Sequence, residues 1–388
     1  MGDFFIHIAS AIKLATIGLI VALISIFSPA TAKPPPVIST EPVATTSEIR
    51  TVAATSTKPE TPPKISTAST TPPAPITNET KQTPLPPVLN PIVATSTPTI
   101  IPEWDTINER ARAAVVNIIC TSQSAGLMQP LSGSGVFIDP KGIILTNAHI
   151  AQYWLIKDYP SKDYLDCVIR QDSPASPRYR AKLVYISPTW IKVHYTDLLT
   201  QDPLGTGEND YALLLVNTTT GPSISLPTSF PYLPPATTDT ENILGQPVLM
   251  AAYPAGFLCG VSIQTTLFMS SAPGAIQGVY TFTDTSIDVL SLGGNVVAQH
   301  GSSGGAVVTG DGKLRGIIVT TSEADTTATR DLHAITISYI NRRFTQETGV
   351  TLPDLLASDV YAVADEFNET LAPTLTKLLT QSLIQTTH

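Results

Sequence analysis

The chain has 388 residues and a formal net charge of −9, and Lys and Arg together account for only 22 of its residues. It has no cluster of basic side chains, which a protein needs in order to contact several nucleic-acid phosphates at once, so we expect no nucleic-acid partner. The length exceeds that of one typical domain, but much of it has a composition that cannot form a core.

Residues 1–32 form an apolar leader. Phe4–Phe27 is mainly apolar, and Leu14–Phe27 has the length of a signal-peptide core. Ala30-Thr31-Ala32 follows with the small-x-small pattern of a cleavage site. A membrane anchor is the alternative, because Phe4–Phe27 could span a bilayer if Lys13 reached the interface. Either interpretation predicts an extracytoplasmic protein, secreted in the first case and bound to the membrane in the second.

Residues 33–102 are interpreted as a linker. They contain 16 of the 34 prolines, together with long runs of Thr and Ser. Such a segment has little apolar area to offset the entropy lost on ordering. We therefore expect a disordered, extended and semi-rigid stalk.

Residues 103–350 have the pattern of an all-β domain. A short amphipathic helix is predicted over Trp104–Val115, and a strand follows over Val116–Cys120. Short strands separated by Gly, Pro and Asp turns, with almost no helix, indicate a barrel or a sandwich. The further strands are predicted near 165–170, 180–186, 211–216, 248–252, 280–283, 306–309, 314–321 and 333–337.

Three segments place reactive side chains at the edges of predicted strands. Gly133–Ile150 reads as a strand, an Asp-Pro-Lys-Gly turn and a second strand that ends at His149. Asp210 opens an apolar run, so its carboxylate needs a partner such as an imidazole N–H. Ser303 lies between glycines, which would let the amides of Gly301 and Ser303 point into one small cavity. A base, an orienting carboxylate and a nucleophile are therefore all present.

With these motifs the chain resembles the trypsin-like serine proteases, and within them the bacterial HtrA/Deg-like branch. The matching segments are Thr146-Asn147-Ala148-His149, Asn209-Asp210-Tyr211-Ala212-Leu213-Leu214 and Gly301-Ser302-Ser303-Gly304-Gly305. Their order along the chain is His, Asp, Ser, whereas subtilisins and α/β-hydrolases place the same roles in other orders. The resemblance covers roughly residues 101–349, and the tail beyond it is too short for a PDZ domain.

The resemblance implies two antiparallel six-stranded β-barrels with the site between them. His149 and Asp210 would come from the first barrel and Ser303 from the second, with the amides of Gly301 and Ser303 as the oxyanion hole. The implied activity is that of a serine endopeptidase, which hydrolyses protein or peptide substrates through an acyl-enzyme. No cofactor and no metal are expected, and no Cys/His spacing suits zinc.

Substrate contacts also follow from the resemblance. In relatives, the segment at Val319-Thr320-Thr321 pairs with an extended substrate backbone. The base of the specificity pocket would lie near Val297, and His300 would line the rim of the cleft. No acidic residue occurs between Val289 and Ser303, so a preference for Arg or Lys would lack its counter-charge. We expect a small or medium apolar residue before the cleaved bond.

Residues 351–388 are predicted to form a helical extension. Their apolar side chains recur at three- and four-residue steps, and Pro373 should break or kink the helix. The helical face either packs on the body of the domain or serves self-association or a partner. The residues that form this face are Leu356, Val360, Val363, Phe367 and Leu371.

The three cysteines are Cys120, Cys167 and Cys259. An odd number at wide spacing argues against a disulfide framework. Buried thiols are the expectation, with a single bridge as the alternative.

Two functions other than proteolysis fit parts of the sequence. The first is a catalytically silent relative that binds peptides in the same cleft. The second is a surface structural protein in which the stalk is the functional element. Neither needs the three reactive side chains that the motifs provide together.

Overall fold

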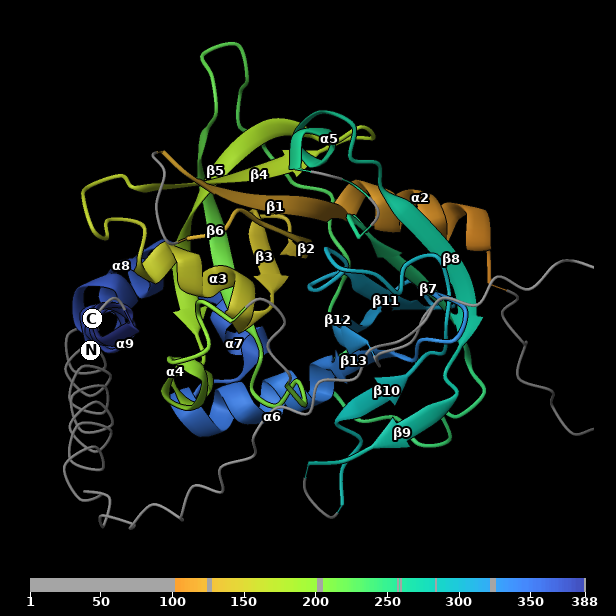
Figure 1. Cartoon of the computed structure of the whole chain (residues 1–388). Coiled ribbons are helices and arrows are strands. Elements are labelled where there is room, and N and C mark those ends of the chain that lie inside the picture. The colour runs from red at the N-terminus through yellow and green to blue at the C-terminus, as the bar shows by residue number, and fades with distance from the viewer. Residues whose placement is uncertain are drawn as a thin grey trace, which may run out of the picture. The chain divides into compact units, whose positions relative to one another are not determined.

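The computed structural model describes residues 102–123, 128–200, 205–256, 258, 260–282, 285–321 and 326–386, with the backbone alone at residues 320, 321 and 386. These residues belong to one compact unit, Thr99–His388 (Figure 1). The predicted leader and nearly all of the predicted linker lie outside the described residues. Within the described ranges, no helix is both long and apolar enough to cross a membrane.

Six strands close into an antiparallel barrel in the order β1-β2-β3-β6-β5-β4 (Figure 1). All four residues of β3 are buried, as are the first five of β6. Such continuous apolar strands are expected where both faces of a sheet are covered. The bounds are β1 (Val115–Ser122), β2 (Leu131–Asp139), β3 (Ile143–Thr146), β4 (Leu165–Gln171), β5 (Ser176–Ile186) and β6 (Ala212–Thr219).

Seven strands form a second antiparallel sheet, which curls into a half-barrel, in the order β8-β7-β11-β12-β13-β10-β9. The predicted all-β class with two barrel-like halves is confirmed, but the second half has seven strands and two free edges. Pro273 lies in edge strand β8, where its lack of an amide donor is tolerated. The bounds are β7 (Pro247–Ala252), β8 (Ser270–Ala275), β9 (Gly278–Tyr280), β10 (Val289–Ser291), β11 (Ala306–Thr309), β12 (Leu314–Thr321) and β13 (Leu332–Thr336).

Short helices occur where none was predicted. The predicted first helix is α2 (Trp104–Ala114), but α3 (Ala148–Leu155), α4 (Pro188–His194) and α5 (Gly260–Thr265) are additional. Seven of the eight residues of α3 are buried, so this helix lacks the exposed polar face that makes a surface helix recognisable in the sequence. His149, expected at the end of a strand, therefore lies in the first turn of a helix.

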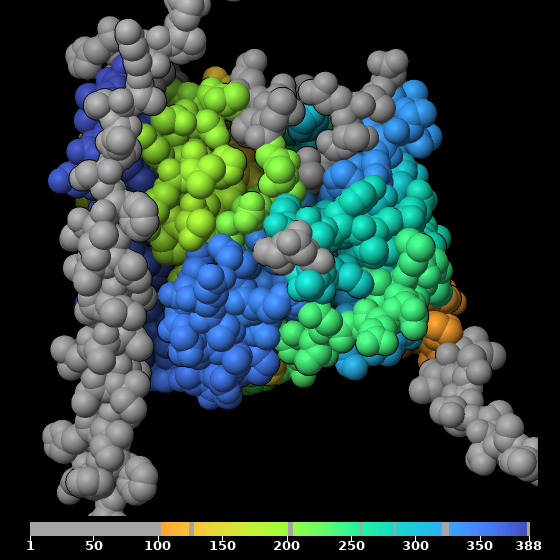
Figure 2. All heavy atoms as spheres, turned by 90° about the horizontal axis from the view of Figure 1, so that it is seen from below, coloured from red at the N-terminus to blue at the C-terminus, as the bar shows by residue number. Residues whose placement is uncertain are grey.

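Four helices complete the chain: α6 (Ile337–Thr348), α7 (Leu352–Ala357), α8 (Val360–Thr370) and α9 (Ala372–Thr386). Helix α8 packs against β5, and α9 packs against α3 and α4. Figure 2 shows α6, in blue, at the surface beside the yellow-green segment that contains α4. The predicted break near Pro373 is present between α8 and α9, and the apolar face of the tail packs on the first barrel.

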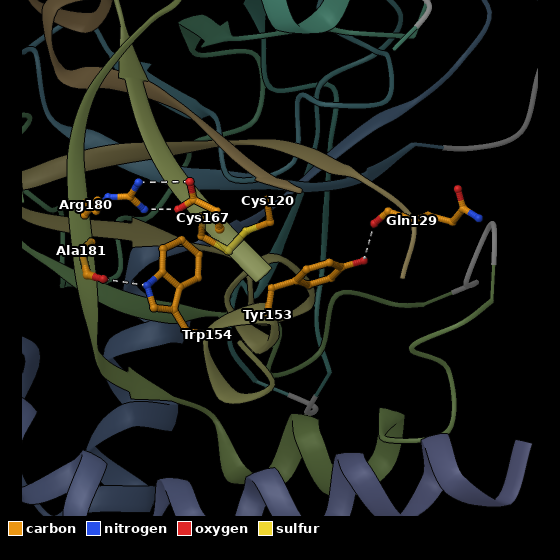
Figure 3. The surroundings of a disulfide bond; sticks show 8 residues. Cys120, Gln129, Tyr153, Trp154, Cys167, Arg180 and Ala181 are labelled. Carbon is orange, nitrogen blue, oxygen red and sulfur yellow. Dashed lines mark hydrogen bonds and ion pairs between the residues drawn. A yellow bond between two sulfur atoms is a disulfide. The ribbon is translucent and has the colours of Figure 1, made fainter. Parts of the chain in front are cut away.

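A disulfide joins Cys120 and Cys167 (Figure 3). The expectation of buried thiols is therefore wrong for this pair. The two residues are 47 positions apart in sequence, but they face each other in the register of β1 and β4, with their Cα atoms 4.0 Å apart. Tyr153 and Trp154 of α3 lie beside the bridge. Cys259 lies outside the described residues.

Candidate active site

His149 and Asp210 form a hydrogen-bonded pair at the mouth of the first barrel. His149 Nδ1 lies 2.7 Å from Asp210 Oδ2, and the His149 amide donates to Asp210 Oδ1 at 3.0 Å. The carboxylate thus holds both the ring and the backbone of one residue. The His149 side chain is 26% exposed and that of Asp210 only 7%, so the imidazole is accessible while the carboxylate is shielded from water. An N–H at Nδ1 leaves Nε2 free to accept a proton.

Asp210 is held in place through its backbone. Its amide donates to the carbonyl oxygen of Gly207 at 3.2 Å, and its own carbonyl accepts from Asn147 Nδ2 at 2.9 Å. Because Asn147 directly precedes α3, this bond connects the aspartate loop with the start of the helix that carries His149. Strand β6 begins two residues after Asp210, close to the start that the sequence predicts.

Ser303 lies in the turn before β11, and this turn sits against the first barrel. The Ser303 carbonyl oxygen accepts from the Ser134 amide at 2.7 Å. A Cβ added at Gly304 would lie 2.0 Å from the Ser134 carbonyl oxygen and 2.7 Å from Thr146 Oγ1. Strand β3 ends at Thr146, three residues before His149. The turn with the predicted nucleophile therefore lies against the segment that leads to the predicted base.

Ser134 connects the two halves of the molecule, and sequence reasoning did not single it out. The side chain is fully buried in β2. Its hydroxyl donates to the Gly301 carbonyl oxygen at 2.8 Å and accepts from the Tyr253 amide at 3.0 Å. The only sequence signal is a small polar residue between Gly133 and Gly135, within a predicted strand.

The Ser303 hydroxyl has one hydrogen bond within the described ranges, to the Val319 carbonyl oxygen at 3.5 Å. The bond from Ser303 to His149 is therefore not formed in this conformation. The side chain of Ser303 is half-buried. Rotation about its χ1 angle would release this long bond and redirect the hydroxyl.

The amides of Gly301 and Ser303 donate to no acceptor among the described residues, whereas their neighbours do. The Ser302 amide donates to the Gln299 carbonyl oxygen at 3.2 Å, and the Gly304 amide donates to the Ile318 carbonyl oxygen at 2.8 Å. Gly301 has a φ of +88°, in the left-handed region that favours glycine. Two unpaired amides in one tight turn can both donate hydrogen bonds to a negatively charged oxygen.

Residues 133–317 match the family model of the trypsin-like peptidase domain. The chain carries a trypsin-like peptidase domain. The match confirms the predicted trypsin-like peptidase domain over these residues. Placement in the HtrA/Deg-like branch rests on the sequence motifs quoted above.

Solved structures are similar to this chain at low identity. A serine endoprotease from Yersinia pestis is 21% identical, with a TM-score of 0.40, over 63% of this chain and 66% of its own. Deg5 is 17% identical, with a TM-score of 0.41, over 66% of this chain and 96% of its own. The Rv3671c protease from M. tuberculosis, in its active form, is 18% identical, with a TM-score of 0.39, over 71% and 95%. The chain thus spans just under two thirds of the Yersinia protein. No curated protein matches the chain.

The residues predicted to bind substrate lie in different environments. Strand β12 pairs with β13 at Thr320 and Thr321, but its pairing with β11 ends at Ile317. In the described part of the peptidase domain, the other edge of β12 at residues 319–321 therefore has no strand partner. His300 is exposed beside Gly301, in keeping with a place at the rim. Val297 is fully buried in the core cluster of the second sheet.

Two further histidines among the described residues also pair with aspartates. His194 Nδ1 lies 2.9 Å from Asp197 Oδ2, and His333 Nε2 lies 3.0 Å from Asp331 Oδ2. His194 ends helix α4 and stacks on Trp190. His149 differs from both because it lies three residues after Thr146, which borders Gly304 of the serine turn. Among the described residues, no group of three His, Cys, Asp or Glu side chains could hold a metal ion.

Proposed function

We propose that this chain is a serine endopeptidase that hydrolyses peptide bonds through Ser303, His149 and Asp210. The observation that carries the proposal is the 2.7 Å contact between His149 Nδ1 and Asp210 Oδ2, on the first barrel, beside the Ser303 turn of the second sheet. The family match supports the reaction class, and the unpaired amides of Gly301 and Ser303 support the site of the negative charge.

His149 acts as the general base in the first half of the reaction. Its Nε2 takes the proton of Ser303 as Oγ attacks the substrate carbonyl carbon and forms a tetrahedral intermediate. Asp210 stabilises the imidazolium, and the two amides bind the oxyanion. His149 then gives the proton to the leaving amine, which leaves an acyl-enzyme. In the second half, a water molecule replaces the amine, and the acid product leaves Ser303 free.

The same segment that holds the Ser303 hydroxyl is the one expected to pair with substrate. An extended peptide added along residues 319–321 would form main-chain hydrogen bonds with β12. Such a bond to the Val319 carbonyl oxygen would compete with the 3.5 Å contact from Ser303. We therefore propose that substrate binding releases the hydroxyl toward His149.

The residue that precedes the cleaved bond is proposed to be small or medium and apolar. Val297 is buried among apolar side chains, and no acidic residue lies between Val289 and Ser303. Profiling with a peptide library should show this preference. A strong preference for Arg or Lys would contradict it.

We also propose that the enzyme is exported, and that its leader serves as an anchor or a signal peptide. The apolar composition of residues 1–32 supports export. The Cys120–Cys167 disulfide supports it too, because such bonds persist mainly in oxidising compartments. Cell fractionation and N-terminal sequencing test this. A mature chain that begins after Ala32 indicates secretion, retention of the leader in a membrane fraction indicates an anchor, and a cytoplasmic chain contradicts export.

The catalytic assignment is tested on the full chain with a fluorophosphonate probe, which reacts with activated serines. The original protein should be labelled and the variant Ser303→Ala should not. Ser302→Ala is the matched control, because the buried Ser302 hydroxyl has no hydrogen-bond partner among the described residues and its loss should leave labelling intact. Labelling that survives in Ser303→Ala, or is absent from the folded original protein, would overturn the assignment.

A further inference from the structure

Helix α6 contacts the residues on both sides of Asp210, from a part of the chain about 130 positions away. Asn209, which precedes Asp210, is 5% exposed and has a φ of +59°. Its amide donates to the Tyr339 hydroxyl at 3.0 Å, and its side-chain Oδ1 accepts from Arg343 Nε at 2.8 Å. A left-handed asparagine backbone is thus held by two side chains of α6.

Tyr211, which follows Asp210, is held by the same helix. Its hydroxyl donates to Glu347 Oε2 at 2.6 Å. Two further hydroxyl groups converge on this carboxylate, with Tyr185 donating to Oε2 at 2.7 Å and Ser187 donating to Oε1 at 2.9 Å. Glu347 has no salt-bridge partner within the described ranges, so these three donors are what hold its carboxylate. Hydrogen bonds to a charged acceptor are roughly twice as strong as those between neutral groups.

The hydroxyl groups keep their protons at any working pH. Burial raises the pKa of Tyr211 and of Tyr185 far above the ordinary range, and the nearby Glu347 carboxylate raises both further. Burial also raises the pKa of Tyr339, which contacts Asn209. All three phenols therefore stay neutral and able to donate. These bonds end on side chains of one helix, so the loop around Asp210 cannot shift without moving against α6.

From this arrangement we infer that α6 positions the triad aspartate, with Glu347 and Arg343 as positioning residues that act through Tyr211 and Asn209. The inference rests on the proposed function, because it concerns the geometry of the same triad. Among the described residues, neither side chain forms a hydrogen bond or ion pair with Asp210. Each fixes a neighbour of Asp210, and with it the direction of the carboxylate toward His149 Nδ1.

The test uses the full chain with Glu347→Ala and Tyr211→Phe. Both should lower kcat by about 10- to 100-fold and leave KM nearly unchanged, because a shift of about 1 Å in a catalytic group can reduce the rate by about 10². The low-field NMR signal of the His149 Nδ1 proton should weaken or move. Glu347→Gln should keep most of the activity, because its side-chain oxygen still accepts from both tyrosines and its amide can donate to Ser187.

Tyr179→Phe is the matched control, because this change removes the same atom from a buried tyrosine of the same barrel. Its ring packs against Phe230, and within the described ranges it forms no hydrogen bond with α6. Unchanged kcat and an unchanged Nδ1 signal in folded Tyr211→Phe would overturn the inference, and so would a loss in Glu347→Gln as large as in Glu347→Ala. Should Glu347→Ala fail to fold, Tyr211→Phe decides alone. Absence of labelling in the original protein would instead overturn the proposed function, so the two failures are distinguishable.

Discussion

At the scale of single residues, the backbone conformation of Gly301 sets the position of its amide, a proposed oxyanion donor. Its φ is +88°, and a Cβ there would lie 2.8 Å from the Tyr253 carbonyl oxygen and 3.0 Å from the Ala255 amide nitrogen. Both contacts are with backbone, which cannot move aside easily. Gly301→Ala should therefore displace one proposed oxyanion donor and lower kcat by about 10²- to 10³-fold. Steady-state kinetics on a peptide substrate measure this.

Gly245→Ala separates local strain from the loss of the donor. Gly245 also has a positive φ, +78°, but no atom lies within 4 Å of a Cβ added there. The substitution should cost some stability and leave kcat close to that of the original protein. Equal activity in both glycine variants would contradict the assigned role of Gly301.

The sequence predicts reactive residues better than it predicts the residues that hold them. His149, Asp210 and Ser303 stand in short motifs whose residue types follow from the chemistry, and the structure pairs the first two. The roles of Ser134 and Asn209 depend on hydrogen-bond partners more than a hundred positions away, and no local sequence pattern reveals such partners. The burial of Val297 likewise depends on how the second sheet closes around it.

At the scale of elements, the strands were predicted where apolar runs end at clear turns. Strands β11 and β12 have the predicted bounds, with a Gly-Asp-Gly turn between them. The sequence does not predict strand β8, because Ser-Ser-Ala-Pro-Gly-Ala contains no strong strand former. The strand forms because it pairs with β7. Where the local sequence does not favour a strand, pairing with a neighbouring strand therefore determines that one forms.

Helix α9 should contribute substantially to stability although it lies outside the matched family region. Leu379 is fully buried, and Thr376 donates to the carbonyl oxygen of Leu155, the last residue of α3, at 2.8 Å. Leu379→Ala should lower the free energy of unfolding by about 2–5 kcal/mol, as core truncations typically do. Urea unfolding measures this. Ile384→Ala, at a 46% exposed position of the same helix, should have a much smaller effect, and equal effects would contradict the packing.

The contribution of the disulfide between β1 and β4 to the free energy of unfolding should also be measurable. It closes a segment of 47 residues, so its reduction should lower the free energy of unfolding by about 2–4 kcal/mol. Urea unfolding with and without a reductant tests the size of the effect. Thiol titration of the unreduced, unfolded chain should find one free thiol among the three cysteines, and a count of three would contradict the bridge.

At the scale of the whole molecule, the buried tyrosines make the free energy of unfolding depend on pH in the alkaline range. Burial raises the pKa of Tyr153 to about 12 and also raises those of Tyr211, Tyr253 and Tyr339. In the unfolded chain, tyrosine has a pKa of about 10, so between about pH 10 and 12 the unfolded state binds fewer protons than the folded one. The free energy of unfolding must therefore fall as the pH rises above about 10.

Urea unfolding at a series of pH values from 8 to about 11, with tyrosinate absorbance recorded in parallel, tests this dependence. The midpoint should fall above about pH 10, and the buried phenols should ionise together with the loss of the fold, because a buried phenolate is poorly solvated. Tyr153→Phe removes one buried phenol, whose hydroxyl makes only a weak 3.4 Å hydrogen bond. In this variant the unfolding midpoint should fall less steeply with pH. Ionisation of all 12 tyrosines in a chain that keeps its native circular dichroism would show that these side chains are not buried as described.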